Sequence, residues 1–267
     1  MLWILIGVVF LAICYLLTLR GRRNHPGWEA FRGARIAHRG LHGDGTPENS
    51  MKAFYRAKER GYGIELDVHL MADGNLAVIH DSLLLRTTGA AGRIEERTTA
   101  ELENYRLEET EEKIPLFSQV LEMVDGKVPL IIELKSEQNP DRLTDGVMSA
   151  LEGYAGAYCI ESFDPRVVRH LRKHYPQVIR GQLSRNFFAS EGKMPWLHRW
   201  IITAHILNFL TLPDFTAYRF CDRKRPGTFL VRKFWGIRAV AWTLRTPEEL
   251  AAAEAEGWLP IFESFTP

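Results

Sequence analysis

Short apolar runs alternate with helix-forming stretches from residue 34 onward, and this alternation limits the possible folds more than any other feature of the chain. The apolar runs are expected to be strands, and they occupy residues 34–38, 63–67, 129–135, 157–162, 178–183, 214–218, 238–243 and 259–264. Eight strands that alternate with helices over about 230 residues favour a closed (β/α)8 barrel of the α/β class, a TIM barrel, over an open sheet.

Several of the intervening helices have recognisable ends. The stretch "PENSMKAFYRAKERG" begins with capping residues and ends at Gly61. Asp164 stands before Pro165 just as Thr246 stands before Pro247. Each of these pairs is typical of an N-cap followed by the first residue of a helix.

The N-terminal residues 2–19 carry no charge, and Arg20, Arg22 and Arg23 follow them. Eighteen apolar residues are just long enough to span a bilayer, whereas a secretory signal would carry its positive charges before the apolar run. We therefore expect residues 1–23 to form one transmembrane helix with a basic flank; a buried core helix is the alternative. The charges after the run predict a single-pass protein of the cell membrane with the rest of the chain in the cytoplasm.

The remaining residues, 24–267, are expected to form the barrel. The gap between the hairpin at residues 63–81 and the next apolar run is too long for one crossover, so a small insertion is expected after this second-strand hairpin, at about residues 82–115. A net charge of +1 argues against a general nucleic-acid-binding protein. The three cysteines lack the spacing of a zinc site or a disulfide framework.

The hairpin "GIELDVHLMADGNLAVIHD" carries acidic residues where a barrel strand usually carries valine. Glu65 and Asp67 share one face because side chains alternate along a strand. A two-residue turn at Asp73 and Gly74 would pair residues whose numbers sum to 147, and it would place Asp67 opposite His80. The hairpin is therefore expected to bring two carboxylates and an imidazole together.

Active sites of TIM barrels lie at the C-terminal ends of the strands. The predicted strand ends deliver polar side chains and one tryptophan at that end of the barrel: His38, Arg39, Glu65, Asp67, His80, Glu133, Lys135 and Trp242. Simpler interpretations exist, because His38 and Arg39 alone could lie in a solvated loop and Glu133 and Lys135 could form a structural ion pair. His69 lies further out on the hairpin and is expected to be solvated. His25, His42 and His170 have no nearby partners in the sequence and are expected to have no role.

The residue types suggest metal-assisted hydrolysis. Three carboxylates that offer only oxygen suit one hard divalent cation, Mg²⁺ or Ca²⁺. Together with such a cation, Arg39 and Lys135 outweigh the carboxylates by one positive charge, which a phosphodiester anion would neutralise. Two histidines without a nucleophilic serine or cysteine beside them suggest a general acid and a general base.

At this point the sequence resembles a known family. The motifs "AHRG", "PENS", "ELDV", the "DG" turn, "HD", "IELK", "SF" and "AWT" follow one another in the order seen in glycerophosphodiester phosphodiesterases, from about residue 34 to residue 265. The resemblance implies a barrel with an insertion after "HD" and hydrolysis of glycerophosphodiesters to an alcohol and glycerol phosphate.

The same resemblance implies roles for individual residues. It implies metal ligation by Glu65, Asp67 and Glu133 and acid–base catalysis by His38 and His80. It also implies phosphate contacts from Arg39 and Lys135 and a place for Trp242 in the substrate pocket. Many members of the family end the last strand with a Thr-Asp pair near a proline, whereas this chain reads "IFESFTP". The role of Glu263 is therefore left open.

A second feature is not explained by hydrolysis. Residues 187–212 are rich in apolar and aromatic side chains, and the stretch up to residue 238 mixes them with arginine and lysine. This pattern fits either an interfacial membrane surface at residues 187–238 or a barrel helix with a solvated basic loop. On the membrane interpretation the substrate is a lysophospholipid, cleaved as by a lysophospholipase D, instead of a soluble diester. A glycosidase and a catalytically silent, membrane-anchored binding protein are the remaining alternatives.

Overall fold

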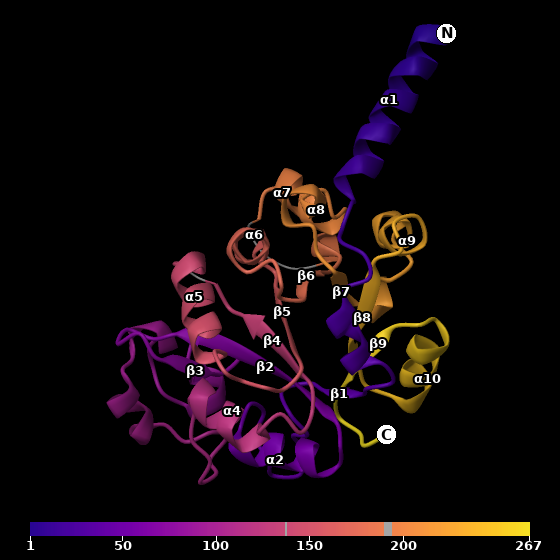
Figure 1. Cartoon of the computed structure of the whole chain (residues 1–267). Coiled ribbons are helices and arrows are strands. Elements are labelled where there is room, and N and C mark those ends of the chain that lie inside the picture. Colours follow the sequence, from indigo (N-terminus) through magenta and orange to yellow (C-terminus); the bar gives the residue numbers. More distant parts are fainter. Residues whose placement is uncertain (137, 190–193) are drawn as a thin grey trace.

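Eight parallel strands form a closed ring in the computed structural model, which describes residues 1–136, 138–189 and 194–267 (Figure 1). The strands are β1 (Ile36–Ala37), β2 (Gly63–Leu70), β4 (Leu130–Leu134), β5 (Tyr158–Ser162), β6 (Arg180–Ser184), β7 (Phe215–Arg219), β8 (Arg238–Leu244) and β9 (Leu259–Phe262). Strand β1 pairs with β2 on one side and with β9 on the other, and these two pairings close the barrel. The predicted barrel is confirmed, and each expected apolar run overlaps a strand.

Helices surround the ring of strands (Figure 1). They are α2 (Met51–Glu59), α4 (Phe117–Val124), α5 (Pro140–Ala150), α6 (Pro165–His174), α7 (Trp196–Thr203), α8 (Asn208–Thr211), α9 (Pro226–Lys233) and α10 (Pro247–Ala255), with single turns at η4 (Phe187–Ala189) and η5 (Phe220–Asp222). The side chains of Ser50, Asp164 and Thr246 cap α2, α6 and α10 by accepting backbone N–H bonds. The predicted helix starts are therefore correct.

The two faces of the strands explain where the polar residues lie. On β4, Leu130, Ile132 and Leu134 pack against the outer helices, while Ile131 points into the barrel. The barrel interior near the N-terminal ends of the strands is apolar, and the helical turn η1 (Pro26–Phe31) packs Phe31 against it. The alternation then brings Glu133 inward, further along the same strand. The interior therefore changes from apolar to acidic toward the C-terminal ends of the strands.

The hairpin register differs by one residue from the prediction. Strand β3 (Leu76–Val78) runs antiparallel to β2, with Val68 opposite Val78 and Leu70 opposite Leu76, so that the paired numbers sum to 146. The turn contains three residues instead of two, because the N–H of Met71 bonds to the carbonyl oxygen of Asn75. Asp67 therefore lies opposite Ile79, and its carbonyl oxygen accepts the Ile79 N–H.

The segment after the hairpin carries its own apolar cluster. It contains α3 (Leu85–Thr88), η2 (Ile94–Glu96) and η3 (Thr99–Asn104). Buried side chains of this segment pack against the outer face of the hairpin through Met71, Ala77, Ile79, Leu84, Ile94, Leu102, Leu107 and Ile114. This arrangement holds α3 beside the C-terminal ends of the strands, where its Arg86 side chain reaches the candidate site.

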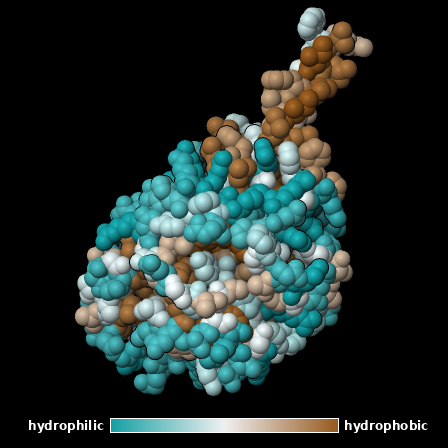
Figure 2. Space-filling view, in the orientation of Figure 1, coloured by the Kyte–Doolittle hydropathy of each residue, from teal (hydrophilic) through white to brown (hydrophobic). Residues whose placement is uncertain are grey.

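The apolar N-terminal residues form helix α1 (Leu2–Thr18), which is 17 residues long and projects from the barrel (Figures 1 and 2). None of the helices in the described ranges is both long and apolar enough to cross a membrane. The predicted membrane-spanning helix is therefore not found. The last turn of α1 docks on the body: Leu19 is buried with Val231 and Ile237, and the indole N–H of Trp235 bonds to the Leu16 carbonyl oxygen over 2.7 Å.

Candidate active site

Three buried carboxylates meet at the C-terminal ends of neighbouring strands. Glu65 and Asp67 point inward from β2, and Glu133 on β4 is the direct register partner of Asp67. Each of the three offers a carboxylate oxygen within 4.8 Å of the others. The hairpin and the next parallel strand therefore build the predicted acidic cluster, which we call the three-carboxylate cluster.

This cluster suits a hard divalent cation. Its donors are all oxygens, as Mg²⁺ and Ca²⁺ prefer. Burial and the charges of Asp67 and Glu133 raise the pKa of Glu65 well above its usual value, which shows that these neighbours oppose a negative charge on Glu65. A bound dication would relieve that repulsion, and the residues present therefore fit a metal ion.

Two cations flank the cluster, as expected. Nζ of Lys135 lies 2.7 Å from Glu133 Oε1 and 3.0 Å from Asp67 Oδ1. Burial alone would raise the pKa of Asp67, but Lys135, His80 and Arg39 together hold it well below its usual value. Nε of Arg39 lies 3.6 Å from Oδ2 of Asp67, and the backbone N–H of Arg39 donates to Glu65 Oε2 over 2.9 Å. Glu133 and Lys135 form the ion pair that was the simpler interpretation, and they form it inside the cluster.

The "PENS" motif supports the same residues from the loop before α2. Both carboxylate oxygens of Glu48 accept from Nη1 of Arg39 at 3.0 Å. The side chain of Asn49 donates to Oδ2 of Asp67 over 2.8 Å. Gly40 makes the loop possible, because its φ is +77° and a Cβ there would lie 2.8 Å from the Ala53 backbone. The sequence motif was recognised, but these two contacts were not predicted.

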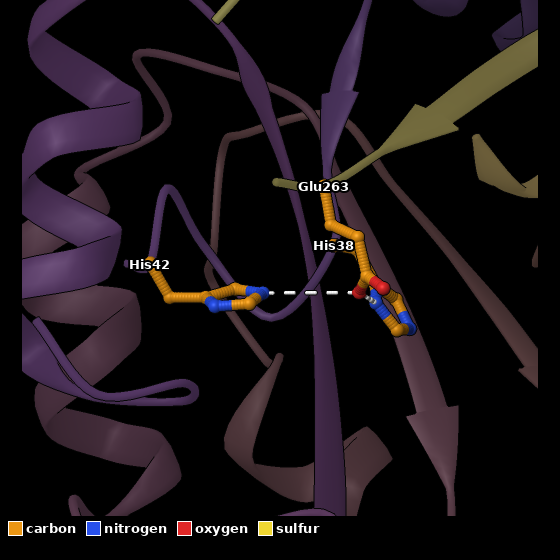
Figure 3. Close-up of side chains that lie close together, drawn as sticks. All are labelled: His38, His42 and Glu263. Carbon is orange, nitrogen blue, oxygen red and sulfur yellow. Dashed lines mark hydrogen bonds and ion pairs between the residues drawn. The ribbon is translucent and has the colours of Figure 1, made fainter. Parts of the chain in front are cut away.

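His38 stands at the end of β1 and is held by the last strand. Its Nδ1 hydrogen-bonds to Oε2 of Glu263, which follows β9 (Figure 3). Its Nε2 lies 3.9 Å from Glu65 Oε2, so the free nitrogen faces the three-carboxylate cluster. Burial would raise the pKa of Glu263, but the hydrogen bond to His38 and the nearby charge of Arg245 hold it well below its usual value. Glu263 is thus an anion that orients His38.

His80 follows β3 on the other side of β2. Its Nδ1 hydrogen-bonds to Oδ1 of Asp81 over 2.6 Å, and Arg86 on α3 bridges Asp81 to Glu48. Burial lowers the pKa of His80 to about 4, with Lys135 and Arg39 contributing and Asp67 opposing, so this imidazole is neutral at pH 7. Burial likewise lowers the pKa of His38. Both imidazoles therefore carry a carboxylate on Nδ1 and leave Nε2 for a substrate.

The structure corrects the predictions for the other histidines. His69 is buried, not solvated: its Nδ1 bonds to Glu95 at 2.8 Å, and its Nε2 lies 3.2 Å from the His80 carbonyl oxygen. His170 lies 2.7 Å from Asp145, and His25 caps η1 by accepting the Gly27 N–H. His42 lies 3.8 Å from Glu263. Because each partner is distant in sequence or belongs to a local cap, these contacts could not be predicted from the sequence.

A cavity of about 410 Å³ opens beside the cluster. His80, Glu133 and Lys135 line its polar side, and Phe163, Phe187, Met194 and Ile202 line its apolar side. Trp242 on β8 packs edge-on against Phe163, with ring centroids 5.7 Å apart. The Trp242 ring therefore supports the apolar side of the cavity. The cavity thus combines an anion-binding side with an apolar side.

Beyond the predicted residues, five further side chains belong to the site: Glu48, Asn49, Arg86, Glu161 and Glu263. Glu161 on β5 is the register partner of Glu133 and is 1% exposed. Burial and the charge of Glu133 raise the pKa of Glu161 well above its usual value. Its inward position follows from the strand alternation, which is the signal that would have identified it.

A closed parallel barrel with these groups at its carboxyl end is the framework of a TIM-barrel hydrolase for anionic esters. Residues 38–262 match the glycerophosphoryl diester phosphodiesterase family, and the chain belongs to this family. It is accordingly an enzyme of the phosphoric diester hydrolase class. Membership favours a diester hydrolase over the glycosidase considered from the sequence.

Relatives that carry this name agree with the assignment. The glycerophosphodiester phosphodiesterase of Caldanaerobacter subterraneus subsp. tengcongensis is 41% identical over 227 residues, which are 80% of this chain and 87% of that protein. Human glycerophosphodiester phosphodiesterase 1 is 27% identical over 82% of this chain and 74% of its own length. Among solved structures, an Oleispira antarctica phosphodiesterase in complex with the product sn-glycerol-3-phosphate has a TM-score of 0.71 at 22% identity, covering 86% of this chain and 92% of that chain. That likeness shows the shared fold.

Proposed function

We propose that the chain hydrolyses glycerophosphodiesters to an alcohol and glycerol phosphate with a divalent cation, Mg²⁺ or Ca²⁺, held by Glu65, Asp67 and Glu133. One arrangement carries the proposal. His38 and His80 flank β2, the strand of Glu65 and Asp67, and each is held through Nδ1 by a carboxylate. A cation on this cluster would supply Lewis-acid stabilisation of the charge on the phosphorus oxygens.

The side chains of the chain supply the proton transfers. The neutral Nε2 of one histidine accepts the proton of the attacking hydroxyl, and the other histidine donates a proton to the departing alcohol. Lys135 and Arg39 hold the phosphate anion, and their carboxylate partners keep both cations in place.

A diesterase assay on the full chain tests this proposal. Glycerophosphocholine and glycerophosphoethanolamine would be hydrolysed after removal of metal with EDTA and again after Mg²⁺ or Ca²⁺ is restored. We expect turnover only with metal, and a loss of about 10²- to 10⁴-fold or more in kcat for His38→Ala and for His80→Ala at unchanged Tm. His198→Ala, which removes an exposed histidine on α7, is the matched control. Near-normal turnover in either active-site variant would remove the acid–base assignment.

Lysophospholipid is a second candidate substrate, and the apolar side of the cavity favours it. Phe187, Met194 and Ile202 line the cavity and belong to the η4–α7 segment. The same segment exposes Trp196 and Trp200 at its surface. An acyl chain could therefore follow apolar side chains from the surface to the phosphate-binding groups. Met194→Ser should lower kcat/KM for lysophospholipid and spare glycerophosphocholine; equal effects on both would count against the lipid.

We propose further that the barrel associates with an anionic membrane through α1 and the surface at its base. The helices α7, α8 and α9 lie at the end of the molecule from which α1 projects (Figure 1), and apolar side chains gather there (Figure 2). The exposed apolar residues of this end include Phe188, Trp196, Leu197, Trp200, Phe209, Phe229 and Phe234. Exposed Lys224, Arg225, Lys233 and Arg238 add positive charge that complements acidic headgroups. The cytoplasmic location of the barrel stays a prediction.

Vesicle sedimentation of the full chain tests the membrane proposal. The wild-type chain should bind vesicles that contain phosphatidylserine more tightly than neutral vesicles. Lys224→Gln with Arg225→Gln should reduce this preference by about 30-fold, since each basic residue near the surface contributes about 1 kcal/mol. Trp196→Ser with Trp200→Ser should weaken binding to both vesicle types. Binding that is indifferent to all four changes would contradict a role for this surface.

A further inference from the structure

A second cluster of metal-binding groups lies beside the three-carboxylate cluster. It consists of His38, His42 and Glu263, whose ligand atoms all lie within 4.8 Å of one another. Figure 3 shows both imidazoles directed at the Glu263 carboxylate, His38 from the end of β1 and His42 from the loop that follows. Two imidazoles and one carboxylate are a donor set of different chemistry from the three carboxylates.

We propose that His38, His42 and Glu263 form a binding site for Zn²⁺ or a similar transition-metal dication, and that its occupation inhibits the enzyme. The proposal rests on the proposed function, because inhibition follows from the acid–base role of His38. Imidazole nitrogens select zinc and its neighbours, while carboxylate oxygens alone favour Mg²⁺ and Ca²⁺. The two adjacent clusters would thus bind different dications: zinc or a similar ion at His38, His42 and Glu263, and Mg²⁺ or Ca²⁺ at the three-carboxylate cluster.

His42 is the residue that points to a ligand. Its Nε2 is buried and has no hydrogen-bond partner among the residues that the structure describes. It lies 3.8 Å from Oε2 of Glu263, which is too long for a hydrogen bond. The ligand atoms of a tetrahedral zinc ion lie about 3.4 Å apart, so small rotations of the side chains would bring this nitrogen to an ion shared with Glu263.

The inhibitory effect follows from what the ion replaces. The proton of the hydrogen bond between His38 and Glu263 lies between Nδ1 of the imidazole and Oε2 of the carboxylate. Zinc bound between these two groups takes the place of that proton, which passes to solvent. The coordinated ring is then fixed on the ion and carries a dication beside it, so its Nε2 no longer accepts or returns a proton at the substrate. Removal of zinc restores the His38–Glu263 hydrogen bond and with it activity.

Arg245 sets the strength of the site. Its Nη2 lies 2.5 Å from Oε1 of Glu263, the oxygen that does not contact His38. The arginine keeps Glu263 ionised, and its charge also opposes a dication on the same carboxylate. Because the Arg245 side chain is 61% exposed, this opposition is partly screened by solvent. Arg245→Gln is therefore expected to tighten zinc binding.

Two readouts on the full chain, with Mg²⁺ saturating, test the inference. The first is the visible absorption of Co²⁺ added in place of zinc, which reports coordination without any need for turnover. The second is inhibition of glycerophosphocholine hydrolysis by Zn²⁺. Wild-type chain should give a tetrahedral Co²⁺ spectrum and be inhibited. His42→Ala should lose the spectrum, keep its activity without zinc, and require at least about 100-fold more zinc for inhibition.

Further variants separate this inference from its alternatives. Glu263→Gln should also lose the Co²⁺ spectrum, and His198→Ala should keep both the spectrum and the inhibition. Zinc inhibition that is unchanged in His42→Ala would overturn the site and place the inhibitory ion elsewhere. A chain that is inactive on every diester but shows a Co²⁺ spectrum dependent on His42 would support the site and remove the proposed function.

Discussion

The side-chain amide of Asn49 donates a hydrogen bond of 2.8 Å to Oδ2 of Asp67, and both residues are buried. Asn49 also has a φ of +53°, a conformation that asparagine and glycine adopt more readily than other residues. The "PENS" turn therefore fixes one oxygen of a proposed metal ligand through a residue whose backbone and side chain both suit the position.

Asn49→Gly should weaken metal binding without unfolding the loop. Glycine keeps the positive φ but removes the amide, so Asp67 loses its orientation. Loss of such a supporting contact lowers metal affinity by about 10- to 100-fold. Calorimetric titration of the EDTA-treated chain with Ca²⁺ or Mg²⁺ would measure this change. Asn75→Gly, on the exposed hairpin turn, is the control, and equal affinities in the two variants would deny Asn49 its role.

Glu263→Gln should lower kcat more than it raises KM. The amide keeps the size of the side chain but loses the negative charge that holds Nδ1–H of His38. Because the hydrogen bond to Glu263 raises the pKa of His38 against the lowering effect of burial, the substitution should lower that pKa further. The limb of the pH–rate profile that depends on His38 would then move to lower pH. An unchanged profile would mean that Glu263 serves packing alone.

Lys135→Met should destabilise the metal-free chain by about 3–5 kcal/mol, because it leaves Asp67 and Glu133 buried without their cation. A divalent cation should recover part of this loss, so the rise in Tm on adding Ca²⁺ should be larger in the variant than in the wild type. Lys127→Met changes an exposed lysine and should alter neither value. A smaller metal-induced rise in Lys135→Met would indicate that Lys135 helps to hold the metal.

His205 should make stability depend on pH. Burial lowers its pKa to about 4 from an ordinary value of 6.5, so between these values the unfolded chain binds a proton that the folded chain does not. The contribution is present above pH 6.5 and is lost as the pH falls toward 4, by on the order of 3 kcal/mol.

His205→Asn should remove this dependence. Asparagine tolerates the positive φ of 58° at this position. Urea unfolding at pH 7 and at pH 4.5 would show a smaller loss of stability on acidification in the variant than in the wild type. Parallel losses in both proteins would assign the acid sensitivity to other groups, such as the paired carboxylates.

The barrel could be predicted because apolar runs and helix caps are local signals. Ser50, Asp164 and Thr246 cap the helices that follow them, and the acidic face of β2 is visible from alternation alone. The hairpin register could not be fixed in the same way. Asp73-Gly74 is compatible with a two-residue and with a three-residue turn, and the contact between Met71 and Asn75 decides between them.

The contacts of Glu263 and His69 could not be predicted from local sequence patterns, because their partners are distant in the chain. Glu263 meets His38 across 225 positions only because β1 pairs with β9. His69 is buried because η2 brings Glu95 to it from the segment after the hairpin. The length of α1 was a third difficulty, since a count of apolar residues does not show where the helix ends; it ends at Thr18, and Leu19 turns into the body.

The pairing of β1 with β9 has a consequence for how activity is acquired during folding. His38 and Glu263 come from opposite ends of the barrel sequence, and they meet only at the seam where the ring closes. A nascent chain that has delivered its first seven barrel strands already contains Glu65, Asp67 and Glu133, yet its His38 has no partner. Competence in proton transfer would therefore arrive with the last strand, so that an incomplete barrel is an inert one.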